Sequence, residues 1–278
     1  MKILYLIGYP VSHSLSALMQ NAAYRSLGLH LDYHLLSVPP EELNTAVKKL
    51  RDPCVLGGNV TIPHKVKILD YIDELDDSAK VVGAVNTIYN QNGVLKGYNT
   101  DGPAAIRALK EVYGDLKDAK VVMIGSGGAA RAVGYCLSSL VRHITILARD
   151  EFKGRYLARS LQNEHSLVSV GVLDESYEQI EEADILINAT PVGMFPKVDE
   201  SPISKSKLHR NLLVFDLVYN PRPTKLLYEA KETGCRTLDG LKMLVYQGCE
   251  AFKIWTGVDP PEQVMKEAAE KGLEAVNR

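Results

Sequence analysis

A glycine-rich run directly after an apolar stretch is the feature that most constrains the fold of this chain. Val121-Val122-Met123-Ile124 is followed by Gly125-Ser126-Gly127-Gly128-Ala129-Ala130-Arg131-Ala132, so a G-x-G-x-x-A pattern lies between a predicted strand and a predicted helix. Gly125 permits a tight turn, Gly127 lets the backbone approach a pyrophosphate, and small Ala130 lets the helix sit against the strand. The helix N-terminus then favours the anion. The run predicts a dinucleotide-binding unit, and a plain turn is the alternative.

The end of the next apolar run bears on the choice of cofactor. Ile144-Thr145-Ile146-Leu147-Ala148 is followed by Arg149 and Asp150, with Lys153 nearby. An acid at this position usually accepts from the ribose hydroxyls of NAD, whereas arginine and lysine can bind a 2′-phosphate. Arg149 and Lys153 therefore favour NADP, and Asp150 leaves NAD or the use of both cofactors open. A solvated charge cluster on a loop is the alternative without a function.

Short apolar runs alternate with amphipathic stretches along the whole chain, which predicts an α/β fold with helices covering mostly parallel sheets. The 278 residues are many for one hydrophobic core and enough for two. We expect a first α/β domain over residues 1–102 and a Rossmann-like dinucleotide-binding domain over residues 103–240. The helical residues 241–278 are expected to pack back on the first domain, with a cleft between the two domains.

The pattern of apolar residues predicts the following elements. In the first domain, strands are expected at residues 3–7, 33–37 and 56–60, helices at 16–27, 40–50 and 64–71, and a hairpin of 85–89 and 94–97 around an Asn-Gly turn. In the second, a helix to about residue 113 precedes strands at 120–124, 143–147, 166–170, 184–189 and 212–217, with helical stretches between several of them. Helical periodicity returns over 241–255 and from 261 onward.

Composition excludes several other classes of protein. The 32 Lys and Arg residues nearly balance the 34 Asp and Glu residues, so no net field attracts nucleic acid or an anionic membrane. The four cysteines are scattered without a C-x-x-C pair, which argues against a zinc knuckle or a disulfide framework and fits a reducing cytosol. The sequence has no run of eighteen apolar residues, so no membrane span is predicted. It also lacks the usual spacings of metal ligands, so no metal site is predicted. A cytoplasmic protein without nucleic-acid or membrane partners is expected.

Polar residues cluster where predicted strands of the first domain end, which is where sites form in α/β folds. The clusters are Ser12-His13-Ser14-Leu15-Ser16, Asn59-Val60-Thr61-Ile62-Pro63-His64-Lys65, and Asn86-Thr87 with Asn99-Thr100-Asp101. Each one alone has a structural reading: the serines and Asp101 as helix caps, and Lys65 as a solvated side chain. Together they indicate a binding or catalytic site.

Taken together, these clusters resemble the motifs of the shikimate dehydrogenase family. Its H-S-x-S pattern corresponds to His13 to Ser16, N-V-T-x-P-x-K to Asn59 to Lys65, G-A-V-N-T to Gly83 to Thr87, and N-T-D to Asn99 to Asp101. Beyond the glycine turn, Asn188-Ala189-Thr190 with Gly193-Met194, Asp216 to Pro221, and Asp239 to Gln247 resemble the family's later motifs. The resemblance runs through nearly the whole chain and implies reduction of 3-dehydroshikimate to shikimate with NADP, by a monomer or a homodimer.

The resemblance implies a role for each site residue. Lys65 and Asp101 would be the catalytic pair, because the alkoxide that forms on hydride delivery needs a proton or a positive charge beside it. Substrate would be bound by Ser14 and Ser16 through its carboxylate, by Thr61, Asn86, Asp101 and Gln247 through its hydroxyls, and by Tyr219 lining the pocket. The cofactor would be bound by Gly125, Gly127, Gly128, Ala129, Arg149, Lys153, Thr190, Val218 and Gly240; Gly240, lacking a side chain, would make room for the nicotinamide ring.

Departures from the family pattern leave other functions open. Ala17 and Gln20 replace a usual Pro and His, and Ala148 and Asp150 replace the Asn and Thr that usually flank the nucleotide arginine. Asp150 favours the alternative of an enzyme that uses quinate as well as shikimate, with NAD. A binding protein that has lost its chemistry is a second alternative, against which intact Lys65 and Asp101 argue. A structural α/β protein is a third.

Overall fold

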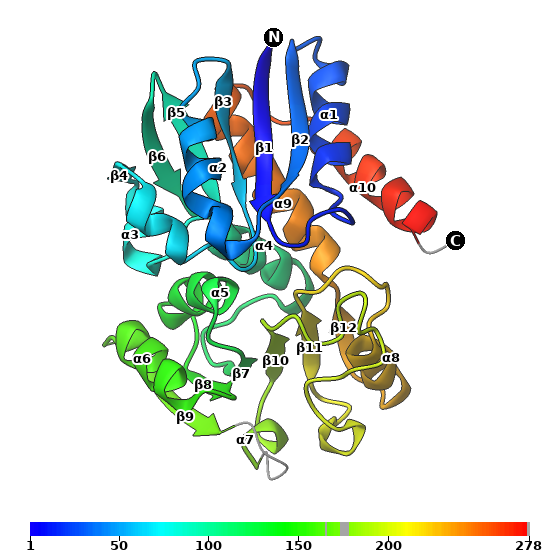
Figure 1. Cartoon of the computed structure of the whole chain (residues 1–278). Coiled ribbons are helices and arrows are strands. Elements are labelled where there is room, and N and C mark those ends of the chain that lie inside the picture. Colours follow the sequence, from blue (N-terminus) through cyan, green and yellow to red (C-terminus); the bar gives the residue numbers. More distant parts are fainter. Residues whose placement is uncertain (165, 173–177, 277–278) are drawn as a thin grey trace. The chain divides into compact units, whose positions relative to one another are not determined.

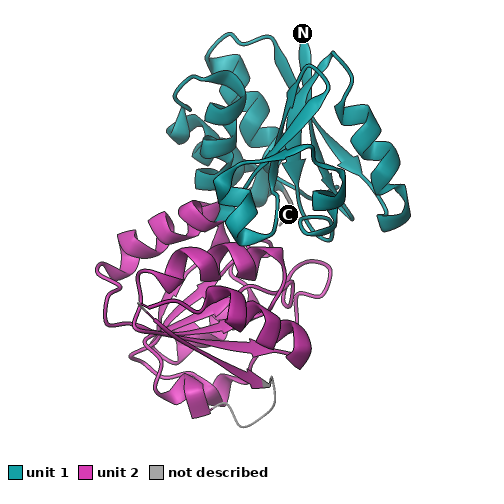
Figure 2. Ribbon diagram, turned by 90° about the vertical axis from the view of Figure 1, so that its left-hand side faces the viewer, with its two compact units in different colours: residues 1–101, 244–278 teal, residues 102–243 magenta. Residues whose placement is uncertain are grey.

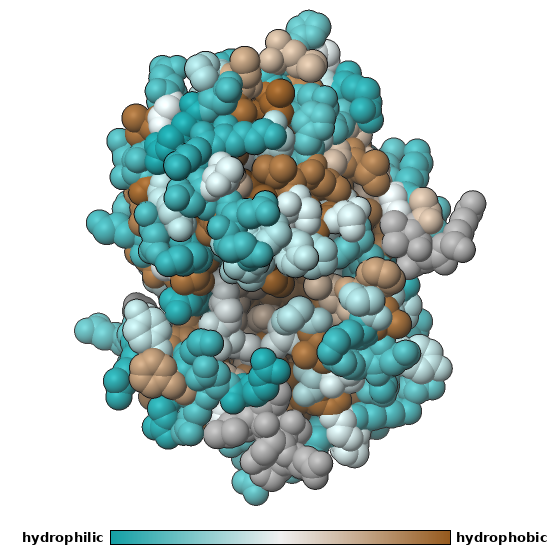
Figure 3. All heavy atoms as spheres, viewed as in Figure 1, coloured by the Kyte–Doolittle hydropathy of each residue, from teal (hydrophilic) through white to brown (hydrophobic). Residues whose placement is uncertain are grey.

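The computed structural model describes residues 1–164, 166–172 and 178–276, and it divides into two compact units. Residues 1–101 and 244–278 form unit 1, and residues 102–243 form unit 2 (Figure 2). Each unit contains a six-stranded sheet, and the predicted α/β class with mostly parallel sheets is confirmed. On the face drawn in Figure 3, the surface is mostly hydrophilic, with apolar side chains in small groups. No helix among the described residues is long and apolar enough to cross a membrane.

The sheet of unit 1 mixes parallel and antiparallel strands. β1 pairs in parallel with β2 and β3, β5 runs antiparallel to β3 and β6, and β4 pairs in parallel with β6 (Figure 1). The sheet has the order β2-β1-β3-β5-β6-β4. These strands are β1 (Lys2–Gly8), β2 (Leu31–Ser37), β3 (Val55–Val60), β4 (Glu74–Leu75), β5 (Thr87–Gln91) and β6 (Val94–Tyr98).

The register of this sheet brings several chain segments to one edge. Ile7 of β1 pairs with Val60 at the carboxyl end of β3. Because β5 is antiparallel, its first residue, Thr87, pairs with both Asn59 of β3 and Tyr98 of β6. The segments that follow β1, β3 and β6, and the one that precedes β5, therefore leave the sheet at the same edge. The polar clusters of the first domain lie in these segments and at the strand ends next to them.

Helices cover both faces of this sheet (Figure 1). On one face, α2 buries Leu43, Val47 and Leu50 in a cluster with Tyr5 and Ile7 of β1. On the other, α9 places Trp255 so that its Nε1 donates to the carbonyl of Ile88 in β5 at 2.9 Å. The helical elements are α1 (Ser16–Ser26), η1 (Pro40–Glu42), α2 (Leu43–Leu50), η2 (Lys67–Tyr71), α3 (Asp77–Val82), α9 (Gly240–Thr256), which begins in unit 2, and α10 (Glu262–Val276).

The sheet of unit 2 is parallel throughout, in the order β12-β11-β10-β7-β8-β9. Its central strands are continuous apolar runs, as expected for a sheet covered on both faces. The strand order reverses direction between β7 and β10, the kind of position where doubly wound folds bind ligands. The strands are β7 (Lys120–Ile124), β8 (His143–Ala148), β9 (Leu167–Val172), β10 (Ile185–Asn188), β11 (Leu213–Asp216) and β12 (Arg236–Leu238). The helical elements are α4 (Asp101–Tyr113), α5 (Gly128–Ser138), α6 (Glu151–Leu161), α7 (Glu178–Glu181), η3 (Lys205–Lys207) and α8 (Lys225–Glu232).

One predicted element is confirmed only in part. The helix expected over residues 64–71 is a turn followed by the short 3₁₀ helix η2, which begins only at Lys67. A non-local hydrogen bond competes with helix formation here, because the Lys65 carbonyl accepts from the Val85 amide, and the His64 side chain contacts the Val38 carbonyl. The same bonds fix the position of Lys65. The elements β4, α3 and β12 were not among those predicted.

Candidate active site

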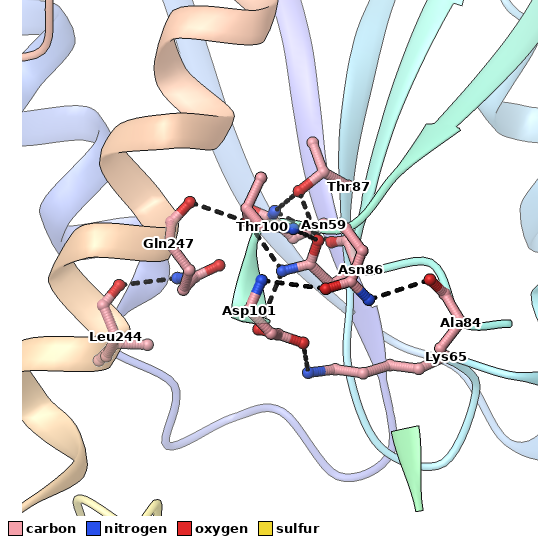
Figure 4. A network of polar contacts seen from close by, with 10 residues as sticks. Asn59, Lys65, Ala84, Asn86, Thr87, Thr100, Asp101, Leu244 and Gln247 are labelled. Carbon is pink, nitrogen blue, oxygen red and sulfur yellow. Dashed lines mark hydrogen bonds and ion pairs between the residues drawn. The ribbon is translucent and has the colours of Figure 1, made fainter. Parts of the chain in front are cut away.

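Lys65 and Asp101 form a largely buried ion pair at the sheet edge of unit 1 (Figure 4). Lys65 lies in the turn after β3, and Asp101 is the first residue of α4, three residues after β6. Lys65 Nζ is 2.6 Å from Asp101 Oδ2, and the two side chains are 15% and 5% exposed. Asp101 Oδ1 accepts from Asn86 Nδ2 at 2.9 Å. Because both carboxylate oxygens are engaged, the orientation of the pair is fixed.

Asn86 uses its full hydrogen-bonding capacity at the centre of this network. Its Nδ2 donates to Asp101 and to Thr100 Oγ1 at 2.8 Å. Its Oδ1 accepts from the Thr100 amide at 2.9 Å and from Thr87 Oγ1 at 3.0 Å. A primary amide has two donors and two acceptor lone pairs, so no capacity is left over. A fully satisfied buried network of this kind rigidifies the groups it contains.

A second layer of polar side chains supports Asn86. Asn59 Nδ2 donates to the Asn86 carbonyl at 3.1 Å and to Thr87 Oγ1 at 3.0 Å, and Asn59 Oδ1 accepts from the Tyr33 hydroxyl at 2.7 Å. Thr100 Oγ1 donates to the backbone carbonyl of Gln247 in α9 at 3.1 Å, which brings Gln247 to the same network (Figure 4). Strands β2, β3 and β5 and helix α9 thus all contribute to the placement of Asp101.

His64 fixes the turn that carries Lys65. Its side chain is 2% exposed, and its Nε2 lies 2.7 Å from the carbonyl oxygen of Val38, which follows β2. The Lys65 carbonyl accepts from the amide of Val85 at 2.8 Å. The turn is therefore held on both sides of the lysine side chain.

The remaining substrate candidates of unit 1 lie in the segments that leave the same edge. Ser14 Oγ lies 3.2 Å from Ser16 Oγ and accepts from the Ser16 amide at 3.3 Å, at the start of α1. Thr61 donates its amide to the Ile7 carbonyl at 2.8 Å, and its methyl carbon lies 2.3 Å from where a Cβ on Gly8 would stand. Only glycine therefore fits at position 8. In the described structure no hydrogen bond links either serine to Lys65 or Asp101.

The glycine turn of unit 2 has the geometry that a pyrophosphate needs. Gly125 has φ +119°, and a Cβ there would lie 2.9 Å from the carbonyl oxygen of Ala189. Gly127 is exposed, and a Cβ there would meet nothing within 4 Å, so a ligand can approach the backbone. Helix α5 begins at Gly128 next to this open space, with half-buried Ala129 in its first turn. These residues fit the phosphates of a dinucleotide.

The charged residues after β8 are exposed and only partly engaged. Asp150 is the N-cap of α6: its Oδ1 accepts from the Lys153 amide at 3.1 Å, and its Oδ2 lies 3.2 Å from Lys153 Nζ. The hydrogen bond that the Lys153 amide donates to Asp150 holds the pKa of this carboxyl below its usual range. Arg149 makes no hydrogen bond or ion pair with any residue that the structure describes. Arg149 and Lys153 can therefore turn toward an anion.

A second buried network lies at the ends of β10 and β11. Asp216 accepts from Asn188 Nδ2 at 2.9 Å, from Thr224 Oγ1 at 2.6 Å and from the amide of Val218 at 3.0 Å. Burial raises the pKa of Asp216 to about 6, although these three bonds act in the opposite direction. Asn188 Oδ1 also accepts from Thr190 Oγ1 at 2.6 Å. The network fixes the backbone that carries Thr190 and Val218.

The structure shows a reason for glycine at position 240 that the sequence did not reveal. A Cβ on Gly240 would lie 2.2 Å from the carbonyl oxygen of Leu217, so packing within unit 2 already requires glycine there. Half-buried Tyr219 follows Val218 on the same loop. Contact of these residues with a cofactor or a substrate stays a prediction.

Of the predicted site residues, the structure joins Lys65, Asp101 and Asn86 directly and Gln247 through Thr100. Sequence reasoning assigned no role to Tyr33 or His64, which support this group, and no local signal identifies them because their partners are non-local. Among the described residues, no group of three or more His, Cys, Asp or Glu side chains could hold a metal ion.

Comparison with known proteins identifies the family. Residues 6–88 match the shikimate dehydrogenase substrate binding domain, residues 107–244 match shikimate / quinate 5-dehydrogenase, and residues 240–270 match the shikimate 5′-dehydrogenase C-terminal domain. The shikimate dehydrogenase (NADP(+)) of Methanocaldococcus jannaschii is 45% identical over 273 residues, covering 96% of this chain and 95% of that protein.

Solved structures agree with the sequence comparison. A crystal structure of shikimate dehydrogenase in complex with NADP⁺ has a TM-score of 0.91 at 43% identity, covering 98% of this chain and 96% of that one. The Thermus thermophilus shikimate 5-dehydrogenase in complex with NADP(H) and shikimate has a TM-score of 0.87 at 35% identity, covering 98% and 100%. The chain belongs to the shikimate dehydrogenase family.

Proposed function

We propose that this protein catalyses the reversible, NADP-dependent reduction of 3-dehydroshikimate to shikimate. The observation that carries the proposal is the buried Lys65–Asp101 pair, held by Asn86 at a sheet edge, in a chain of this family. An acid–base pair kept out of water and fixed in orientation is what carbonyl reduction requires. A sensor that only bound the substrate would have no need of it.

Unit 1 binds the substrate in this proposal, and unit 2 binds NADP. The Ser14 and Ser16 hydroxyls donate to the substrate carboxylate near the start of α1, where the helix dipole favours an anion. Thr61, Asp101 and Gln247 contact the ring hydroxyls, and Asn86 reaches a hydroxyl by exchanging one of its present hydrogen bonds for it. The Thermus relative, which binds NADP(H) and shikimate, supports this assignment.

Lys65 carries the proton in the reaction. When bound, NADPH supplies a hydride to the ketone carbon, and negative charge develops on the ketone oxygen. Lys65 Nζ donates a proton to that oxygen, and in the oxidation direction it takes the proton from the hydroxyl. Asp101 accepts from Lys65 throughout and keeps the Nζ aimed, because Asn86 holds the other oxygen of the carboxylate. Asp101 also stabilises the protonated form of the lysine by its charge.

NADP is held by unit 2 in the proposal. The amides of Gly127, Gly128 and Ala129 face the pyrophosphate at the start of α5. Arg149 and Lys153 bind the 2′-phosphate, and Thr190, Val218 and Gly240 lie beside the nicotinamide half. The named relatives that use or bind NADP support this choice over NAD.

The protein acts in the cytoplasm as a monomer or a homodimer, on a small-molecule substrate and without nucleic-acid or membrane partners. Its four cysteines are all free, which supports a reducing compartment.

Steady-state oxidation of shikimate tests the function, with NADP and NAD compared under the same conditions and reduced nicotinamide followed by absorbance. Turnover of shikimate mainly with NADP is expected, with quinate a poor substrate. Comparable turnover of quinate, or with NAD, would replace the proposal by the dual-specificity enzyme. Absence of turnover with either cofactor would favour a binding protein.

A further inference from the structure

Arg131 is a cation in an unfavourable place. It lies in the first turn of α5, just after the glycine turn, where the partial positive charge of the helix N-terminus opposes a positive side chain. Its Nε is buried, and among the described residues it has no hydrogen-bond partner. A buried, unpaired donor of a charged group is costly, because it loses its hydrogen bonds to water and gains none. An anionic ligand at this end of α5 would offset both costs.

Stacking on Tyr156 directs Arg131 toward α6. Arg131 Cζ lies 5.3 Å from the centroid of the Tyr156 ring. Helices α5 and α6 lie side by side (Figure 1), and a Cβ on Gly134 would meet the side chain of Leu161. Tyr156 is one turn beyond Lys153 on α6, so the two share a face of that helix. The guanidinium of Arg131 therefore lies toward α6, the helix that follows Arg149.

The charges at this end of α6 match a phosphate dianion once Arg131 is included. Arg131, Arg149 and Lys153 carry three positive charges, and Asp150, engaged as the N-cap, carries one negative charge. A net charge of two positive units remains, which balances the two negative charges of a fully ionised phosphate monoester. Glu151 and Arg155 pair with each other and leave this balance unchanged.

We propose that Arg131 is a third ligand of the 2′-phosphate of NADP and a determinant of NADP preference. Its cation–π contact with Tyr156 holds the guanidinium beside α6, and the terminal nitrogens of the guanidinium donate to phosphate oxygens. The inference rests on the proposed use of NADP by this chain. It also offers a reason why Asp150 does not abolish NADP use: the third cation offsets the carboxylate.

Binding of adenosine nucleotides tests this role without the reaction. The ligands are 2′,5′-ADP, which carries the 2′-phosphate, and 5′-ADP, which does not, titrated by calorimetry into the whole protein. Arg131→Met keeps the apolar stem of the side chain. It is expected to weaken the binding of 2′,5′-ADP about tenfold, the typical effect of losing one charge-assisted hydrogen bond. The affinity of this variant for 5′-ADP should stay within about twofold of the wild-type value, because the pyrophosphate contacts are kept.

Matched variants separate this role from a structural one. Arg159→Met, which removes an exposed arginine from the last turn of α6, should leave the binding of both ligands unchanged. Tyr156→Leu should weaken the binding of 2′,5′-ADP only about threefold, since the guanidinium is kept and only its cation–π contact is lost. Arg131→Lys keeps the positive charge without the planar set of guanidinium donors, and it replaces Arg131→Met in the test if that variant does not fold. It should weaken the binding of 2′,5′-ADP less than Arg131→Met does.

Other outcomes would overturn the inference. Equal weakening of both ligands by Arg131→Met would place Arg131 at the pyrophosphate, and no change in either would leave it a helix-packing residue. Failure of the proposed function is a separate result: a wild-type protein that oxidises no shikimate, yet needs Arg131 for 2′,5′-ADP, would refute the function and not this inference. If the wild type turns over shikimate with NADP and Arg131→Met binds 2′,5′-ADP as tightly as the wild type does, this inference alone would be refuted.

Discussion

The Lys65–Asp101 network of unit 1 and the charged end of α6 in unit 2 are built in opposite ways. In the first, the ion pair is largely buried, and every hydrogen-bonding position of Asn86 is used by the protein itself. In the second, Lys153 and Asp150 are exposed, Arg149 has no partner among the described residues, and the buried Nε of Arg131 is unpaired. One region is complete without a ligand, and the other is complete only with one.

The contrast follows from what each region has to do. A group that transfers a proton must be in place before the substrate arrives, because reorganisation during the reaction raises the barrier. A phosphate brings its own strong acceptors, so exposed cations can close on it after the encounter, and salt screens their attraction for it. Substitutions in the first region should therefore change kcat, and those in the second should change the affinity for the cofactor.

Loss of Lys65 is expected to have the largest effect. Lys65→Met removes the proton donor and the positive charge beside the developing alkoxide, and kcat should fall about 1000-fold, within the range for such groups. The affinity for NADP should hardly change. The measurement is shikimate oxidation at saturating NADP. The matched control is Lys67→Met, which removes an exposed lysine of the same segment, paired with Asp70; it should keep full activity. A Lys65→Met enzyme that retains a tenth of kcat would assign the proton to another group.

Asn86 and Asn90 test whether the network matters for catalysis beyond stability. Both are buried at or near β5; Asn90 Nδ2 donates to three backbone carbonyls, and its Oδ1 accepts from Gly93. Either alanine variant leaves buried polar groups unpaired and should lower the free energy of unfolding by about 3 kcal/mol. Only Asn86→Ala should also lower kcat, by about tenfold, because only Asn86 holds Asp101. Denaturant unfolding and kcat measured on both variants decide this; an equal fall in kcat would make the effect one of stability alone.

Asp216 provides a pH-dependent comparison with these satisfied networks. Burial raises its pKa to about 6, so the folded state binds a proton more tightly than the unfolded state does. The resulting stabilisation is full below about pH 4, the ordinary range of aspartate, and is lost as the pH rises through about 6. The loss is at most about 3 kcal/mol, from about two pKa units at 1.36 kcal/mol each.

Asp216→Asn keeps the shape of this side chain and cannot ionise. The difference in unfolding free energy between wild type and variant should therefore shift in favour of the variant between about pH 4 and pH 7, as measured by urea unfolding. Other titrating groups contribute equally to both proteins and cancel. A difference that is constant with pH would show that hydrogen bonds to the carboxylate balance its burial, and a shift toward the wild type would show that they outweigh it.

The sequence contained most of this arrangement where the signal was local. Lys65, Asn86 and Asp101 stand in motifs at strand ends, and the glycine turn follows its strand directly, so both regions could be predicted. Their assembly into one network depended on the antiparallel register of β5, which no single segment determines. The helix expected over residues 64–71 was confirmed only over Lys67–Tyr71 for a similar reason, because the Lys65 carbonyl accepts from the amide of Val85, far along the chain.

The residues that sequence reasoning left without a role share this non-local character. Tyr33 reaches Asn59 across the sheet, His64 contacts the carbonyl of Val38, and Arg131 lies against a tyrosine of the next helix. Hydrophobic periodicity and motif spacing report on a residue's own segment, so none of these contacts had a signal in the sequence. Asp150 differs from these residues, because its bond is local: beside Arg149 it could be interpreted as a ribose ligand, and the structure shows a helix cap that accepts from the Lys153 amide.

Substitution of that cap should have the smallest effect and is the sharpest test of how the charged end of α6 works. Asn caps a helix about as well as Asp, so Asp150→Asn keeps α6 intact while removing one negative charge near the phosphate-binding residues. Binding of NADP should tighten about threefold at low salt and by less at high salt, since the attraction between exposed charges is screened. Binding of NAD should not change. Asp150→Ala removes the same charge together with the cap, and it should show the same shift in NADP affinity with a loss of about 1 kcal/mol in stability. If Asp150→Asn instead weakened NAD and left NADP unaffected, the carboxylate would be a ribose ligand, and the exposed region would be as specific in its hydrogen bonding as the buried one.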